Sequence, residues 1–214
     1  MYRAAGFVLE IERQPMDFSE VIRKRRMVRR FTSEPVDAEV IARICDVARR
    51  APSAGYSQGQ ALVVVTDEAT RREIARLVSE EEYVKDGFAP WISQAPVQVV
   101  ACVSEAAYHR RYQEADKLDA AGNETEWPVP YWFMDIGCTV MALLLAVVNE
   151  GLAAGFAGAE TTERRLELQR LLGIPEEYVA VGVIPIGHGV PDKPSPSIAR
   201  RRKPTTDFAH YERW

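Results

Sequence analysis

Positive charge is concentrated in two short clusters of an otherwise acidic chain. Residues 23–30 contain six Lys or Arg side chains and residues 200–203 contain four, although the 214-residue chain has a net charge of -4. Eight of these ten cations are Arg, whose guanidinium presents a rigid fork of donors that matches a phosphate group. If the clusters meet in space, they indicate a site for a small anion. For any single side chain, a solvated basic surface is the simpler alternative.

Other kinds of site find less support in the composition. A nucleic-acid surface is disfavoured because the chain is acidic overall and shows no recognition fold or stacking platform. The three histidines are widely separated, so we expect no metal site and no His-assisted nucleophile. Cys45, Cys102 and Cys138 lie in apolar contexts without CxxC spacing, which is typical of reduced intracellular thiols.

Two stretches of small residues could let a ligand approach the backbone closely. Residues 51–60 form a polar loop in which Ser53 could hydrogen-bond a polar group, although a plain helix-to-strand turn is the alternative. Residues 151–160 include seven Gly or Ala, which leaves backbone amides open to a flat partner. This second stretch is not GxGxxG, so a Rossmann phosphate turn is not supported.

Hydrophobic periodicity and capping residues predict the elements that position these stretches. Helices are predicted from near residue 18 and over about 38–50, 67–81, 104–118, 131–149 and 161–172. Strands are predicted at 61–66, 97–103 and 178–186, with an extended segment at 152–158 and an irregular stretch at 83–94. The unbroken apolar runs at 62–65 and 97–103 indicate strands buried on both faces. This order favours an α+β sandwich with a mixed sheet, formed as one domain over 17–214 after an extension at 1–16.

The chain shows no convincing targeting or membrane segment. Its longest apolar run, near 136–148, is about thirteen residues, whereas a helix needs roughly 20 to span a bilayer. The first sixteen residues mix charges with short apolar runs and do not resemble a signal peptide. We therefore expect a cytoplasmic protein with no membrane partner.

The chain resembles the FMN-dependent nitroreductase family from residue 17 to its end. The resemblance rests on motifs that occur in order: Arg25-Arg26-Met27-Val28-Arg29-Arg30-Phe31, Glu34-Pro35-Val36, Ala48-Arg49-Arg50-Ala51-Pro52-Ser53-Ala54-Gly55, Val63-Val64-Val65-Thr66-Asp67, Asp135 with 143–146, Gly151-Leu152, Leu172-Gly173-Ile174-Pro175, Ile184-Pro185-Ile186-Gly187 and Arg202-Lys203-Pro204. It implies a three-layer α/β/α sandwich and a homodimer with flavin sites at the interface, much of it formed by the helix at 131–149. It also implies FMN as the cofactor and NADH or NADPH as the electron donor.

The resemblance assigns the two basic clusters to the cofactor. Arg25, Arg26 and Arg29 match the opening motif, in which the first Arg meets the FMN phosphate and ribityl chain and the later cation lies near the N1/O2 edge of the ring. Arg200 and Arg202 match the terminal pair that completes the phosphate site. The resemblance implies no catalytic side chain, because the flavin carries the chemistry and Arg29 is its electrostatic partner.

Two backbone segments are assigned in the same way. One is the loop that the partner subunit lays over the flavin, matched by Pro52, Ser53 and Ala54. The other is the segment whose amides approach N5 and O4, matched by Ala157, Gly158 and Ala159. The chain departs from the family at Met27, where Ser is usual, at Tyr56, where Asn is usual, and at Gly59-Gln60, where Pro-Trp is usual. Met27 and Tyr56 occupy cofactor-binding positions, and Tyr56 and Gln60 are expected to reshape the pocket wall.

The excursion at 120–133 falls where the family places its variable substrate lid. Four aromatic residues there could stack over a planar substrate, although core packing is the alternative: Trp127, Tyr131, Trp132 and Phe133. The expected activity is hydride transfer from NAD(P)H through flavin to a nitroaromatic, quinone or related conjugated acceptor. The alternatives are a specialised enzyme (flavin-consuming, dehalogenating or cofactor-biosynthetic) and a non-catalytic flavin-binding sensor.

Overall fold

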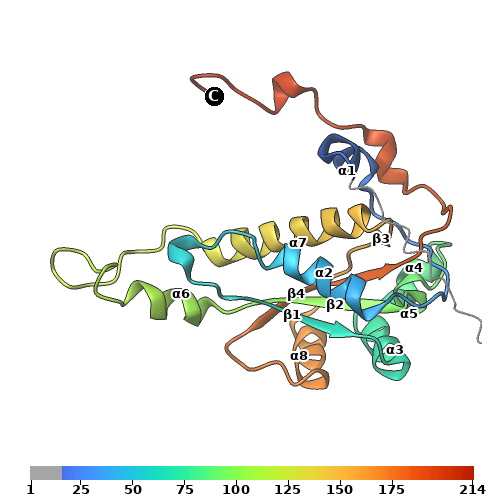
Figure 1. The fold of residues 1–214 in the computed structure, drawn as a ribbon, viewed down its shortest axis with the longest axis horizontal. Coiled ribbons are helices and arrows are strands. Elements are labelled where there is room, and N and C mark those ends of the chain that lie inside the picture. The colour runs from blue at the N-terminus through green and yellow to red at the C-terminus, as the bar shows by residue number, and fades with distance from the viewer. Residues whose placement is uncertain (1–15) are drawn as a thin grey trace, which may run out of the picture.

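A four-stranded sheet forms the middle layer of the protein (Figure 1). The structure is a computed structural model that describes residues 16–214, so the extension predicted at 1–16 lies, apart from Met16, outside the described residues. The strand order is β1 (Gln60–Val65), β2 (Val97–Val103), β4 (Val179–Gly187) and β3 (Ala153–Ala154). Each strand pairs antiparallel with its neighbour. The parallel component of the predicted mixed sheet is, among the described residues, a single bridge between Met27 and Ala154.

Helices cover both faces of this sheet, which confirms the predicted α/β/α sandwich. Side chains of β2 alternate between two cores, as the pleat of a strand requires. Val97, Val99, Ala101 and Val103 face α2 (Ala38–Ala48) and α7 (Tyr131–Asn149). Val100 and Cys102 face α3 (Glu68–Leu77), α5 (Trp91–Gln94) and α8 (Thr162–Leu171). β1 was predicted to be buried on both faces, but it is an edge strand and Val64 is exposed.

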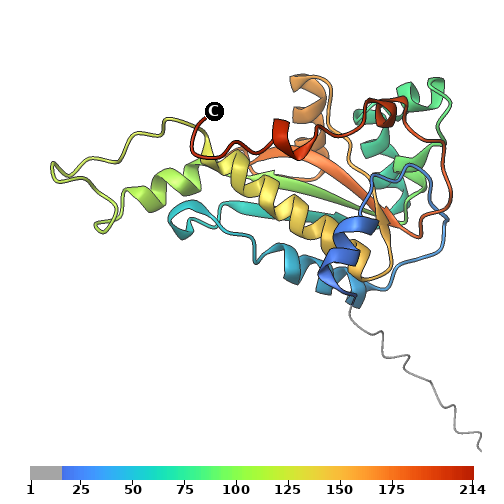
Figure 2. The same ribbon diagram turned by 90° about the horizontal axis from the view of Figure 1, so that it is seen from above.

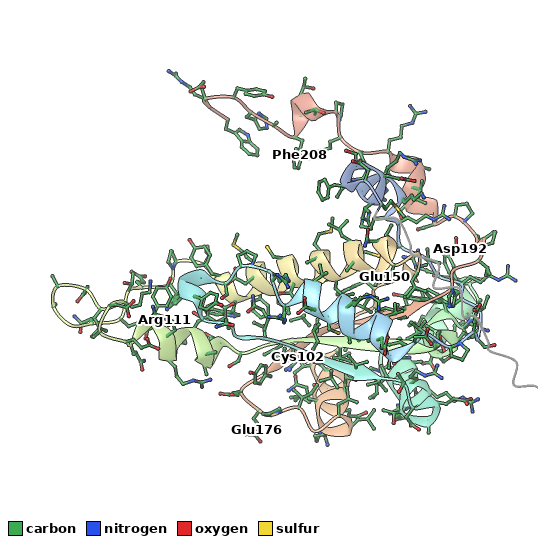
Figure 3. All side chains as sticks on the ribbon, in the orientation of Figure 1. Cys102, Arg111, Glu150, Glu176, Asp192 and Phe208 are labelled. Atoms are coloured by element: carbon green, nitrogen blue, oxygen red, sulfur yellow. The ribbon has the colours of Figure 1, made fainter. Side chains whose placement is uncertain are left out.

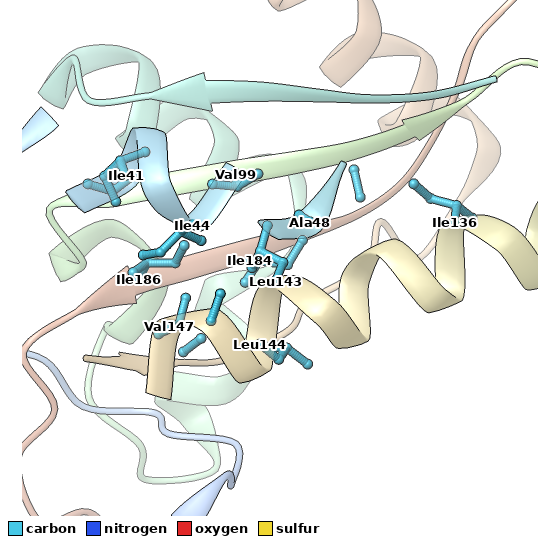
Figure 4. Close-up of a cluster of buried hydrophobic side chains, with 14 of the residues drawn as sticks. Ile41, Ile44, Ala48, Val99, Ile136, Leu143, Leu144, Val147, Ile184 and Ile186 are labelled. Carbon is cyan, nitrogen blue, oxygen red and sulfur yellow. The ribbon is translucent and has the colours of Figure 1, made fainter. Parts of the chain in front are cut away.

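The core beneath α7 is closely packed (Figure 4). Ile44, Leu143, Val147 and Ile184 are fully buried there, and each such side chain stabilises the fold by about 1.5–3 kcal/mol. By length and composition alone, α7 could cross a membrane, with a mean hydropathy of 1.9. In the structure, 39% of that stretch is buried inside the protein.

Short helices, 3-10 turns and a C-terminal tail complete the domain. The remaining elements are α1 (Phe18–Lys24), α4 (Glu80–Lys85), α6 (Glu105–Tyr112) and the 3-10 turns η1 (Ala54–Tyr56), η2 (Pro196–Arg200) and η3 (Thr205–Asp207). The stretch 83–94, predicted to be irregular, contains the end of α4 and all of α5. After β4, the chain runs back along α7 on the side away from the sheet (Figures 1 and 2). This tail exposes Ile198, Phe208, Tyr211 and Trp214.

Candidate functional site

After α1 ends at Lys24, the rest of the first basic cluster is an extended segment held on both sides by backbone hydrogen bonds. On one side the Val28 amide donates to the Ala154 carbonyl at 2.9 Å. On the other side the Thr32 amide donates to the His188 carbonyl at 2.9 Å, and the Val190 amide donates to the Arg30 carbonyl at 3.1 Å. These bonds fix the direction in which the Arg side chains of the segment leave the backbone.

The two basic clusters meet at a cavity of about 610 Å³. From the first cluster it is lined by Arg25, Arg26, Met27 and Arg29. From the second it is lined by Arg201 and Arg202, with Lys193 and Asp192 beside them. The predicted Arg200 is exposed and does not line this cavity, and its neighbour Arg201, which the motif did not select, does.

Aromatic rings lie beside two of these cations. The guanidinium of Arg29 lies 5.4 Å from the ring centroid of Phe88 and 5.9 Å from that of Trp91. The Lys193 ammonium lies 5.7 Å from the centroid of the same Phe88 ring and donates to the Asp86 carbonyl at 3.1 Å.

Asp192 has a different function in the cavity. Its carboxylate accepts from the Arg29 amide at 2.7 Å, which ties the segment after β4 to the first cluster. The cavity lining therefore has six cations and one carboxylate, a set that suits a doubly charged phosphate.

The Gly- and Ala-rich segment lies directly beside the first cluster through the Met27–Ala154 bridge. The Ala157 amide is already used, because it donates to the Val183 carbonyl at 2.9 Å. The amides of Gly158 and Ala159 make no hydrogen bond to any of the described residues. A side chain built at Gly158 would meet no heavy atom within 4 Å, so this position faces open space. These two amides are available to a ligand.

The loop at 51–60 is fixed to the opposite end of α7. Oδ2 of Asp135 accepts from the Ala54 amide at 2.8 Å and from the Tyr108 hydroxyl at 2.8 Å. Burial, together with the Asp135 carboxylate, raises the pKa of Tyr108 well above its ordinary value, so the hydroxyl keeps its proton. The Arg111 guanidinium donates to the Gly55 carbonyl at 3.0 Å. Half-buried Ser53 accepts from the Gln58 amide at 2.9 Å, and Pro52 is exposed.

Within one chain, the loop at 51–60 and the cavity lie far apart. Asp135 lies near the start of α7, whereas the bridge to Ala154 lies just beyond its end. A 19-residue helix is about 28 Å long. Figure 3 shows the same separation, with Arg111 at one end of the molecule and Asp192 at the other.

The four aromatic residues predicted for the substrate divide into two pairs. Trp132 is buried and Trp127 half-buried, and both rings pack with Tyr108 and His109. Tyr131 and Phe133, by contrast, are 36% and 46% exposed at the start of α7. The second pair is available to a ligand, whereas the first pair supports the excursion from below.

Glu124 secures the excursion to α6. Its carboxylate accepts from the Trp127 indole at 2.7 Å and from the Gln113 amide at 3.1 Å, and Oε1 lies 2.5 Å from Nδ1 of His109. Within residues 16–214, no group of His, Cys, Asp and Glu side chains is arranged to hold a metal ion.

Comparison with known proteins agrees with this architecture. The model of the nitroreductase family matches residues 22–188. A Methanothermobacter thermautotrophicus protein named as an NADH dehydrogenase/NAD(P)H nitroreductase is 27% identical over 93% of this chain and 88% of its own. The iodotyrosine deiodinase of Nematostella vectensis is 26% identical over 90% of this chain and 74% of its own. The NADPH:FMN oxidoreductase of Vibrio harveyi, solved with NAD⁺, superposes with a TM-score of 0.68 at 22% identity, over 92% of this chain and 77% of its own.

Proposed function

The chain belongs to the nitroreductase family of oxidoreductases, and on that premise we propose that it is an FMN-dependent enzyme that passes electrons from NAD(P)H to a conjugated acceptor. The acceptor class is a nitroaromatic, a quinone or a related planar compound. The observation that carries the proposal is the cavity at which the two basic clusters meet. We place this activity in the cytoplasm.

The residues present fit FMN. In the proposed complex, Arg25, Arg26, Arg201 and Arg202 hold the phosphate, and Arg29 lies at the N1/O2 edge of the ring. The open amides of Gly158 and Ala159 suit the N5 and O4 edge. When bound, FMN supplies hydride acceptance and donation, which no side chain of this site can provide.

The protein's own contribution is binding and electrostatics. Arg29 would stabilise negative charge on the bound ring, and the Phe88 and Trp91 rings hold its guanidinium in place without a ligand. Because these groups are positioned before the ligand binds, little reorganisation accompanies a change of charge in the site.

We propose that a second copy of the chain completes the site. The loop at 51–60 and the cavity lie at opposite ends of α7, so an antiparallel pair of α7 helices would bring the loop of one copy to the cavity of the other. The side of α7 away from the sheet suits such an interface, because Met134 and Met141 are exposed on it. The exposed Phe208 and Trp214 of the tail would be covered by the same association.

A flavin titration followed by anaerobic reduction tests the proposal. We expect the purified protein to bind FMN, to lose its flavin absorbance on addition of NADH or NADPH, and to regain it when a quinone or nitroaromatic is added. Colourless protein that takes up no added FMN contradicts the proposal. Bound FMN that neither nicotinamide reduces would instead identify a flavin-binding sensor.

Reductive dehalogenation is the second candidate. It is supported by the similarity to iodotyrosine deiodinase over 90% of this chain. In this reaction a carbon–halogen bond is replaced by a carbon–hydrogen bond, two electrons and a proton are consumed, and halide is released. Measurement of iodide released from an iodophenol distinguishes it, because a dehalogenase should do this faster than it reduces generic quinones.

A further inference from the structure

Tyr56 has a backbone conformation that its side chain does not favour. Its φ is +60°, in the left-handed region, where a bulky non-glycine residue is rare and costs conformational energy. Its neighbour Gly55 also has a left-handed φ, of +59°, which glycine adopts without strain, and a side chain there would collide with the ring of Tyr112. A Gly or Asn at position 56 would form the same turn with less strain.

The surrounding loop imposes this conformation through several hydrogen bonds. The Tyr56 amide donates to the Ser53 carbonyl at 2.9 Å, and the Ser57 hydroxyl donates to the Ala54 carbonyl at 2.6 Å. Asp135 and Arg111 hold the loop from below through the Ala54 amide and the Gly55 carbonyl. The strain is therefore maintained by the fold and is not a consequence of a loose loop.

The Tyr56 side chain contributes nothing to the fold that explains its presence. It is 76% exposed, and within the described residues it makes no hydrogen bond and no ring contact. The turn that carries it contacts α6 and α7, so the ring is displayed at the end of the molecule where Tyr131 and Phe133 are also exposed. Tyr56, Tyr131 and Phe133 therefore give this end of α7 three exposed aromatic rings.

We propose that Tyr56 is a substrate-binding residue that stacks on the planar conjugated acceptor in the site completed by the second copy. The inference rests on the proposed function in its dimeric form. It places the ring on the acceptor, although the position matches a cofactor contact in the family. A rigid aromatic ring suits this role, because it offers a large flat contact and loses little conformational freedom on binding.

Three variants test this assignment in the FMN-loaded dimer. Tyr56→Gly should raise KM for a nitroaromatic or quinone acceptor about two- to tenfold, the value of one aromatic pair, and leave KM for ferricyanide unchanged. It should also raise the Tm of the apoprotein by about 2–4 °C, because the left-handed strain is relieved. Tyr56→Phe, which keeps the ring, should retain the acceptor KM within about twofold.

Gln58→Gly is the matched control. Gln58 is the other strained non-glycine residue of this loop, at φ +50°, and it carries no ring. We expect it to raise Tm in the same way and to leave the acceptor KM unchanged.

Two results would overturn the inference. One is a Tyr56→Gly protein with unchanged KM for aromatic acceptors. The other is a loss of FMN affinity as large as the loss of acceptor binding, which would place the ring on the cofactor. Failure of the wild-type protein to bind FMN or to be reduced by NAD(P)H would refute the proposed function as well, and the FMN titration shows which of the two has failed.

Discussion

The two ends of α7 present opposite kinds of chemistry. At its C-terminal end, six cations line one cavity; two of them, Arg29 and Lys193, lie beside aromatic rings, and the Arg29 amide donates to the Asp192 carboxylate. At its N-terminal end, Asp135 and Arg111 hold a strained loop, and the exposed side chains include three aromatic rings, those of Tyr56, Tyr131 and Phe133. The first end suits an anion, and the second suits a flat apolar surface.

Because of this difference, ligand binding should change the stability of the two ends by different amounts. A cluster of like charges is destabilising until an anion arrives, so the cavity end should gain stability from its ligand. The loop end already has its hydrogen bonds and should change little on binding. Substitutions at the cavity end should therefore lower FMN affinity, whereas substitutions that remove the hydrogen bonds of the loop end should lower the free energy of unfolding.

The largest expected effect comes from removing a phosphate ligand at the cavity end. Arg25→Ala should raise the FMN dissociation constant about 10- to 100-fold, because a charge-assisted hydrogen bond is worth about 1.5–3 kcal/mol. Arg23→Ala is the control, since Arg23 is exposed and does not line the cavity. Equal losses in a fluorescence titration of the two variants would mean that the cluster is only a diffuse basic surface.

At the loop end, Asp135→Ala should act on stability first. The substitution leaves the buried Tyr108 hydroxyl and the Ala54 amide without their acceptor, at an expected loss of about 2–4 kcal/mol in the free energy of unfolding. Asp135→Asn keeps one acceptor oxygen and should lose less. Urea denaturation of the apoproteins measures both, and an unchanged midpoint for Asp135→Ala would show that the loop is held by packing alone.

A smaller effect is expected from the Phe88 ring, which lies beside Arg29 and Lys193. Phe88→Leu keeps apolar volume but removes the π face beside Arg29 and Lys193, so FMN affinity should fall about two- to tenfold. Phe88→Tyr keeps the face and should bind FMN as the wild type does. If Phe88→Leu also binds FMN normally, the ring only fills space and does not hold the two cations.

Local patterns predicted those parts of the molecule that local forces determine. Asp67 and Thr161 cap the helices that follow them, at the starts that the sequence predicts, and β2 is buried on both faces as its apolar run indicates. The meeting of the basic clusters was also predictable, because charge of this density in an acidic chain needs a common partner.

The remaining features depend on contacts between distant residues. The start of α5 is capped by the Glu80 carboxylate, which accepts from the Ile92 amide at 2.6 Å, so no adjacent residue announces the helix. Asp192 meets Arg29 across 163 positions. Arg201 lines the cavity in place of Arg200 because η2 ends there with a φ of +56°, which turns the chain in a way that a count of cations does not reveal.

The smallest expected effect is a pH dependence in the stability of the excursion at 120–133, which lies at the loop end of the molecule. Glu124 raises the pKa of His109 above 6.5, and Glu105, 3.5 Å from Nε2, adds to the shift. The Trp127 indole, followed by His109, lowers the pKa of Glu124 below 4.5.

The contribution of His109 to the stability of the excursion is complete below its unfolded pKa and is lost as pH rises through the raised value. The Glu124 contribution is complete above its unfolded pKa and is lost as pH falls through the lowered one. Protection of residues 113–130 from limited proteolysis should therefore be greatest between about pH 4.5 and 6.5 and decline above neutrality. Because the His109 side chain is 37% exposed, solvent screening keeps the change modest. His109→Gln should remove the decline at high pH while FMN binding at the cavity end stays the same, and a decline that persists in this variant would assign the pH dependence to another group.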